Sequence, residues 1–220
     1  YNKDTPLQLP LNNTPSNVYL SSSPPSLCAA GRTPDLQSIL SVMEDAESFV
    51  YIAVMNYLPT MEFSHPKRYW ADIDTQLRRV AYEKRIKVRL LISCWNSTQP
   101  VMFSFLKSLA SVYNPKNNLD IQVHVISHTY FIFICPISHS EKKIMCLNII
   151  CGVLFSGTSN WSGDYFVNTA GSALVVNQTA SQSVESTVQS QLKAVFERDW
   201  NSGYSTPLTQ HSNLKDFCYF

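Results

Sequence analysis

Residues 49–55 read F-V-Y-I-A-V-M, a continuous apolar run with the length of one β-strand. A strand that is apolar on both faces is typical of a sheet centre covered by helices on both sides. Thr33 and Pro34 are suited to be the N-cap and first residue of a preceding helix. Apolar residues then recur at helical spacing at Leu36, Ile39, Leu40, Met43 and Ala46.

Helical and strand patterns continue to alternate on both sides of this run. The spacing predicts helices over 70–85, 102–113 and 186–200, and strands over 88–92, 121–126 and 173–176. Alternation of this kind is typical of layered α/β proteins. We therefore expect an α/β fold with a mixed, mostly parallel sheet flanked by helices.

Two segments depart from this alternation. Residues 1–34 are rich in Pro, Ser and Asn, which predicts an extended lead-in before a folded domain over 35–220. Residues 127–156 hold half of the six cysteines and only three charges, Glu141, Lys142 and Lys143. Strands at 130–134 and 144–155 fit this atypical segment, but without clean alternation. We expect the sheet to be disturbed there.

Composition bounds the function. The 220 residues suit one large domain or half of a bilobal protein, and a hydrophobic share of 45% allows a sizeable core. Because the net charge is only +1, nucleic-acid binding would need a local basic patch. No apolar run reaches 18 residues and the first residues do not resemble a signal peptide. If the protein is lumenal, we expect the chain to be part of a longer precursor.

The cysteines and glycosylation motifs point to an oxidising compartment. No C-x-x-C pair occurs, which argues against a zinc ribbon, and we predict no metal site. Asn-x-Ser/Thr acceptors fit a lumenal or extracellular glycoprotein, and they begin at Asn12, Asn96, Asn160 and Asn177. Cys28 and Cys218 lie near the two ends, so we predict a disulfide between them; two free thiols are the alternative.

Four separated blocks carry a family resemblance: V-M-N-Y-L-P-T-M-E-F-S-H-P-K-R-Y-W (54–70), V-R-L-L-I-S-C-W (88–95), G-T-S-N-W-S-G-D-Y-F (157–166) and F-E-R-D-W (196–200). In order and spacing they resemble the phospholipase D superfamily, closest to its lumenal endolysosomal branch of single-pass type II membrane proteins. The resemblance covers residues 1–126 and 157–220 and fits a C-terminal half. It implies 5′-to-3′ exonuclease activity on single-stranded nucleic acid, or phosphodiesterase and transphosphatidylase chemistry on phospholipids.

The resemblance also implies a site. Each half of such a protein supplies H-x-K-x4-D/E followed by G-[ST]-x-N. Residues two apart on a strand share a face, so H-x-K aims an imidazole and an ammonium into one pocket. One His forms a phosphohistidine, the other protonates the leaving oxygen, and Lys and Asn neutralise phosphoryl charge without metal or cofactor. By this match Asn160, with Thr158 and Ser159, would bind phosphate.

The chain departs from the family where the H-x-K motif should stand. Thirteen or fourteen positions before Gly157 the sequence has Ile144 and Lys143, which do not match. The nearest candidates are His139 and Lys142, but H-x-x-K on a strand puts the two side chains on opposite faces. His139 and Lys143 would share a face but lie about 13 Å apart. We therefore expect no intact catalytic pair here.

Strand ends supply further candidates. Asn56 and Tyr57 follow a buried strand, where α/β sheets place their ligands, and Trp95 follows the next one and could stack a base. The loop S-H-P-K-R (64–68) could contact a polyanion, although a solvated loop explains it as well.

Three hypotheses follow. The chain is the C-terminal half of a phospholipase D-type phosphodiesterase that lacks activity as written; or it is a catalytically dead member or binding module. In the third, residues 127–156 are a replaced or misread segment in an otherwise ordinary enzyme. The expected partners are a phosphodiester substrate, the N-terminal half-domain and, in a homodimer, a second copy of the chain. The expected location is the lumen of the endoplasmic reticulum, Golgi or lysosome.

Overall fold

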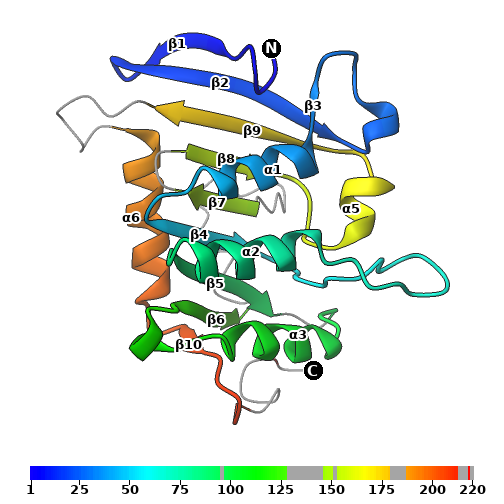
Figure 1. Cartoon of the computed structure of the whole chain (residues 1–220), viewed down its shortest axis with the longest axis vertical. Coiled ribbons are helices and arrows are strands. Elements are labelled where there is room, and N and C mark those ends of the chain that lie inside the picture. Colours follow the sequence, from blue (N-terminus) through cyan, green and yellow to red (C-terminus); the bar gives the residue numbers. More distant parts are fainter. Residues whose placement is uncertain (95–96, 128–145, 151–152, 179–186, 213–217, 219–220) are drawn as a thin grey trace.

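The structure is a computed structural model that describes residues 1–94, 97–127, 146–150, 153–178, 187–212 and 218 (Figure 1). Within these residues a ten-stranded sheet has the order β1-β2-β9-β8-β7-β4-β5-β6-β10, with β3 paired to β2. The strands are β1 (Leu7–Leu11), β2 (Thr14–Ser23), β3 (Thr33–Pro34), β4 (Phe49–Val54), β5 (Lys87–Cys94), β6 (Ile121–Ser127), β7 (Cys146–Ile150), β8 (Val153–Gly157), β9 (Gly171–Gln178) and β10 (Ser205–Pro207).

Helices cover both faces of this sheet. They are α1 (Asp35–Glu44), α2 (Asp72–Glu83), α3 (Val101–Ala110), α5 (Gly163–Val167) and α6 (Val188–Trp200), with 3-10 turns at Pro25–Leu27 and Pro115–Asn117. In Figure 1, α1, α2 and α3 cross the near face, α6 lies behind the sheet, and α5 stands at one end of the strands. The predicted α/β sheet flanked by helices is confirmed.

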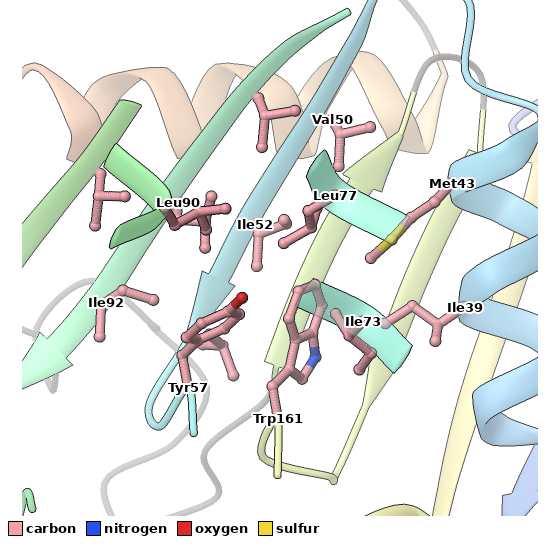
Figure 2. Packing of buried hydrophobic residues seen from close by; sticks show 14 of the residues in the cluster. Ile39, Met43, Val50, Ile52, Tyr57, Ile73, Leu77, Leu90, Ile92 and Trp161 are labelled. Carbon is pink, nitrogen blue, oxygen red and sulfur yellow. The ribbon is translucent and has the colours of Figure 1, made fainter. Parts of the chain in front are cut away.

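The central strand β4 is buried on both faces, as its apolar run predicted. Ile52 is fully buried and faces the core formed with α1 and α2, where Figure 2 shows it near Leu77. Its neighbour Tyr51 points to the other face and stacks on Phe196 of α6, with ring centroids 4.8 Å apart. Burying each large apolar side chain stabilises the fold by about 1.5–3 kcal/mol.

Parallel pairing is concentrated in the three neighbouring strands β4, β5 and β6. β4 pairs in parallel with β5, and β5 with β6, because helical crossovers connect them. The short β2–β3 pair is also parallel. The remaining neighbours pair antiparallel. The prediction of mostly parallel pairing therefore holds for β4–β5–β6 and not for the antiparallel strands on either side.

The prediction that residues 1–34 form an extended lead-in before the folded domain was wrong. β1 and β2 form an antiparallel hairpin, and β2 pairs with β9 from Ser16 to Ser23. Side chains in β2 alternate, since Tyr19 and Ser21 are buried while Leu20 is exposed. The buried positions include Ser and Thr, so the alternation is weak in hydrophobicity and the Pro-, Ser- and Asn-rich composition hides it.

The predicted Cys28–Cys218 disulfide was also wrong in one partner. Cys218 is bonded to Cys94 at the end of β5, with Cα atoms 5.6 Å apart, and Cys28 is free. The chain after α6 returns through β10, which pairs with β6 next to β5, and this path brings Cys218 to Cys94 rather than to the N-terminal hairpin. By loop-closure entropy such a long cross-link contributes about 4–5 kcal/mol.

The predicted helices and strands between 35 and 126 and between 171 and 200 are confirmed, with ends shifted by a few residues. One cap differs: Pro34 is the N-cap of α1, and Thr33 belongs to β3, where its hydroxyl accepts from Lys3 N–H at 2.9 Å. In the atypical segment, β7 and β8 pair antiparallel, whereas residues 130–134 lie outside the described residues. No described helix has the length and apolar character needed to cross a bilayer.

Candidate functional site

The turn after β8 meets the end of β4. Trp161 N–H donates to the Asn56 carbonyl at 2.9 Å, and Leu58 N–H donates to the Trp161 carbonyl at 2.8 Å. Tyr57 and Trp161 form a parallel bridge, and their rings lie side by side in the core (Figure 2). The structure thus brings together Asn56 and Asn160, predicted site residues from separate parts of the sequence. We call this contact the amide junction.

The aromatic residues after Asn160 anchor this junction. Trp161 is 2% exposed, and Phe166 stacks on Trp70 with centroids 5.6 Å apart. Gly163 starts α5 so close to Trp70 that an added Cβ would lie 2.8 Å from its ring. Glycine is therefore required where α5 packs on the loop after β4, and the aromatic surface serves to fix the turn that carries Asn160.

The three predicted phosphate-site residues differ in environment. Asn160 is half-buried and its Nδ2 donates to the Tyr165 hydroxyl at 3.3 Å. Thr158 is exposed, and its Oγ1 accepts from Ser172 N–H at 3.2 Å. Ser159 is buried beside Gly171, where an added Cβ would lie 2.7 Å from Ser159 Oγ. Thr158 and Ser159 thus join the turn to the start of β9, while Asn160 lies at the amide junction.

A carboxylate that the sequence analysis missed organises the same place. Glu62 accepts from Asn56 Nδ2 at 3.1 and 3.3 Å, from Gln99 Nε2 at 2.7 Å and from Ser162 Oγ at 3.1 Å. Asn56 Oδ1 is buried and has no hydrogen-bond partner among the described residues. Glu62 stands in a loop without a recognisable motif, so only its position in the block 54–70 could have suggested a role.

A second carboxylate holds the loop after β4 against α5. Asp164 is 2% exposed and accepts from Phe63 N–H at 2.9 Å, Ser64 Oγ at 3.0 Å and Asn168 Nδ2 at 2.7 Å. Burial acts to raise the pKa of Asp164, but these hydrogen bonds outweigh it and the pKa is lowered. Asp164 therefore remains charged and fixes the loop.

Tyr57, predicted to line the site, is committed to the fold through its hydroxyl. The side chain is 1% exposed, and its OH donates to Asp74 Oδ1 at 2.5 Å, while Arg78 Nε donates to Asp74 Oδ2 at 2.8 Å. Burial and the Asp74 charge raise the pKa of Tyr57 well above its ordinary value. The phenol stays protonated and ties the end of β4 to α2.

The letters H-x-K-x4-D do occur in the chain, at His65, Lys67 and Asp72, and sequence analysis overlooked them. His65 and Lys67 are exposed in the loop after β4, and Asp72 begins α2. The motif requires a strand, which puts the His and Lys side chains on one face, and these residues do not lie on a strand. Lys67 Nζ instead donates to Gln99 Oε1 at 3.3 Å, which links it to the Glu62 cluster.

Several predicted residues cannot be placed. His139, Lys142 and Trp95 lie outside the described residues. The start of β7 lies beside the end of β8, because Cys146 pairs with Gly157 in the register of the hairpin. Within the described part of the chain, no group of three or more His, Cys, Asp or Glu side chains is arranged to hold a metal ion.

Comparison with known proteins identifies relatives. Residues 1–129 match the family described as PLD3/4, PLD-like domain. The chain is 53% identical to the 5′-3′ exonuclease PLD3 of Xenopus laevis, with all of this chain and 45% of that protein aligned. It is 46% identical to human 5′-3′ exonuclease PLD3 over 94% of this chain and 42% of that protein. For mouse 5′-3′ exonuclease PLD4 the identity is 42%, over 98% and 43% respectively. The chain spans less than half the length of these relatives.

Solved structures share the fold. Nuc from Salmonella typhimurium, a phospholipase D family member, superposes with a TM-score of 0.58 at 15% identity over 89% of this chain and 99% of that one. NucT from Helicobacter pylori gives 0.55 at 17% identity over 88% and 99%. At these identities the likeness concerns the fold alone. The family match over more than half of the sequence establishes that the chain belongs to the PLD3/4 family of phospholipase D-like domains.

Proposed function

We propose that the chain is one half of a phospholipase D-type phosphodiesterase and that the amide junction binds a phosphoryl group. The observation that carries this proposal is the hydrogen bond from Trp161 N–H to the Asn56 carbonyl, which joins two distant sequence blocks at one strand end. Carboxamide N–H groups stabilise charge on phosphoryl oxygens. Asn160 is the principal ligand in this proposal, with Thr158, Ser159 and Asn56 beside it.

The substrate we propose is single-stranded nucleic acid, with a phospholipid as the alternative. The relatives are named 5′-3′ exonucleases, which favours the nucleic acid. The loop next to the amide junction also exposes cations and aromatic rings that suit a polyanion with bases, namely Phe63, His65, Lys67, Arg68 and Tyr69.

In this proposal the chain binds but does not cleave when alone. The positions where the family motif belongs hold Lys143 and Ile144, and the relatives are more than twice as long as the aligned region. We therefore propose that one imidazole–ammonium pair comes from the other half-domain. The second pair would come from an H-x-K-x4-D/E segment in the place of residues 127–156, which do not match that motif. A lumenal location as part of a type II membrane protein belongs to the same proposal.

The absence of the second motif also favours a non-catalytic binding module. The two functions agree on phosphate binding and differ in whether the complete protein turns over substrate. The nucleotide sequence around codons 127–156 separates them further. A neighbouring segment that encodes H-x-K-x4-D/E supports a replaced or misread segment in an enzyme, whereas its absence supports the binding module.

Phosphate binding and turnover of the 220-residue chain test the proposal. We expect inorganic phosphate to bind in calorimetry, Asn160→Ala to weaken binding about tenfold, and Asn177→Ala, an exposed change on β9, to leave it unchanged. We expect no hydrolysis of bis-p-nitrophenyl phosphate. Turnover that disappears on His65→Ala or His139→Ala would overturn the assignment of an inactive half. Light scattering reports whether a second copy associates.

A further inference from the structure

We propose that Glu62 is the positioning residue of the amide junction, an inference that rests on the proposed function. Glu62 lies in the loop between β4 and α2, and its carboxylate contacts the start of this loop and two other segments. These are Asn56 after β4, Gln99 just before α3, and Ser162 at the N-cap of α5. One side chain therefore connects the end of β4, the segment just before α3 and the turn that follows Asn160.

The chemistry of the three partners requires a carboxylate. Asn56 and Gln99 present N–H groups and Ser162 presents O–H, so all three donate to Glu62. An ionised carboxylate is an acceptor on both oxygens, whereas a carboxamide of the same shape is a donor on one side. Glutamine at this position would set an NH2 group against at least one donor.

The carboxylate fixes which way the Asn56 amide points. With Nδ2 held at 3.1 Å from Glu62 Oε2, the amide cannot rotate by half a turn without bringing Oδ1 against a negative charge. Its main chain is held as well, since the Asn56 carbonyl accepts from Trp161. Ser162 follows Trp161 directly, so Glu62 restrains both sides of the amide junction.

The same network reaches the exposed loop. Gln99 donates to Glu62 through Nε2 and accepts from Lys67 Nζ through Oε1. An exposed cation is thereby linked through two hydrogen bonds to the side chain that orients Asn56. A bound polyanion that contacts Lys67 would thus be aligned with the amide junction.

Simple electrostatics and the proposed positioning role predict opposite changes in phosphate affinity when the charge of Glu62 is removed. An experiment can therefore distinguish them. A negative charge beside a phosphate site repels the ligand, so removal of the charge alone should tighten phosphate binding. The Asn56 NH2 group carries two N–H donors. If Glu62 holds one of them and thereby directs the other toward the ligand, Glu62→Gln should weaken phosphate binding although it removes a negative charge. A side chain with a merely structural role would change stability without this reversal of sign.

The experiment titrates inorganic phosphate into the 220-residue chain and follows side-chain amide signals by NMR. We expect Glu62→Gln to raise the Kd about fivefold and to shift the Asn56 NH2 signals. Glu47→Gln, the same change of charge at an exposed position between α1 and β4, should stay within about twofold of the parent chain. Gln99→Leu, which removes one donor, should raise the Kd about threefold and serves if Glu62→Gln does not fold.

A double-mutant cycle shows whether Glu62 acts through Asn56. In the Asn56→Ala background we expect Glu62→Gln to give no further loss. Equal or tighter binding by Glu62→Gln, or losses that multiply in the double variant, would overturn the inference while leaving the proposed function intact. A parent chain that binds no phosphate would overturn both.

Discussion

The amide junction and the sheet face under α6 both hold polar side chains within apolar surroundings, but they use them differently. Under α6, the His124 ring stacks on Trp200 at 3.7 Å between centroids, and its Nδ1 lies 2.8 Å from Ser205 Oγ. The Arg89 guanidinium lies over the rings of Trp200 and Tyr51, 5.1 and 5.3 Å from their centroids. These polar groups are held by aromatic faces.

At the amide junction the polar groups are held by hydrogen bonds to one carboxylate instead. The Glu62 carboxylate accepts hydrogen bonds from Asn56, Gln99 and Ser162. These hydrogen bonds orient the Asn56 amide and hold the turn that carries Asn160. Aromatic clamps of the α6 type serve the stability of the fold. We infer that a cluster of oriented amides at strand ends is organised for a ligand, so the two regions should separate stability from binding.

The largest expected effect tests the α6 face. Trp200→Ala removes the ring shared by His124, Arg89 and Phe196, and should lower the free energy of unfolding by about 3–5 kcal/mol. Urea unfolding measures this loss. Phosphate affinity of the folded fraction should not change. A loss of affinity comparable to that of Asn160→Ala would remove the distinction between the two regions.

Acidification should weaken the α6 face next. Burial, with a smaller contribution from the Arg89 charge, lowers the pKa of His124 from 6.5 to about 4. The unfolded chain therefore binds this proton at a higher pH than the folded chain does. The stabilisation is complete above pH 6.5 and is lost as the pH falls toward 4, by about 2–3 kcal/mol since the ring is partly exposed to solvent.

Unfolding free energies at pH 7 and pH 4.5 measure this effect. Because carboxylates titrate in the same range, the relevant quantity is the difference between the parent chain and His124→Gln, with exposed His211→Gln as the control. The His124 variant should show the flatter pH dependence. Equal slopes in all three proteins would show that His124 does not stay neutral in the folded chain.

The smallest effect concerns the turn of the amide junction. Gly171→Ala would place a Cβ 2.7 Å from Ser159 Oγ and from Ser23 Oγ, so both hydroxyls must move, at a cost of about 1 kcal/mol. Gly203→Ala is the matched control, because no atom lies within 4 Å of the added Cβ. Thermal midpoints compare the two. Equal midpoints would mean that the packing around Ser159 is loose.

Sequence patterns predicted the parts of the fold with strong periodicity. The apolar run of β4 and the helical spacing in α1, α2, α3 and α6 gave the correct elements, because burial on one or both faces leaves its mark on residue types. Strand β2 was not predicted, because its buried face includes the polar residue Ser21. The Ser21 hydroxyl donates a hydrogen bond to Asp35 at 2.6 Å rather than packing as an apolar side chain. The disulfide partner of Cys218 could not be predicted, because it depends on the tertiary path that brings the end of the chain back beside β5.

Sequence patterns named two residues of the proposed site. Asn160 followed from G-[ST]-x-N and Asn56 from its place after a buried strand, and the structure places them at one junction. Glu62, Gln99 and Ser162 belong to three segments whose proximity arises from tertiary packing, so no spacing in the sequence could join them. Conversely, the letters of His65, Lys67 and Asp72 fit a motif whose strand geometry is missing there.

The most direct test of the account is an NMR titration of the 220-residue chain with inorganic phosphate, in which each main-chain amide and each Asn and Gln side-chain amide is followed. We predict that the NH2 signals of Asn160 and Asn56 shift together with one saturating dissociation constant, while Asn177 on β9 does not move. Shifts confined to residues of the 64–68 loop, or no saturable shift at all, would contradict the claim that the amide junction binds a phosphoryl group.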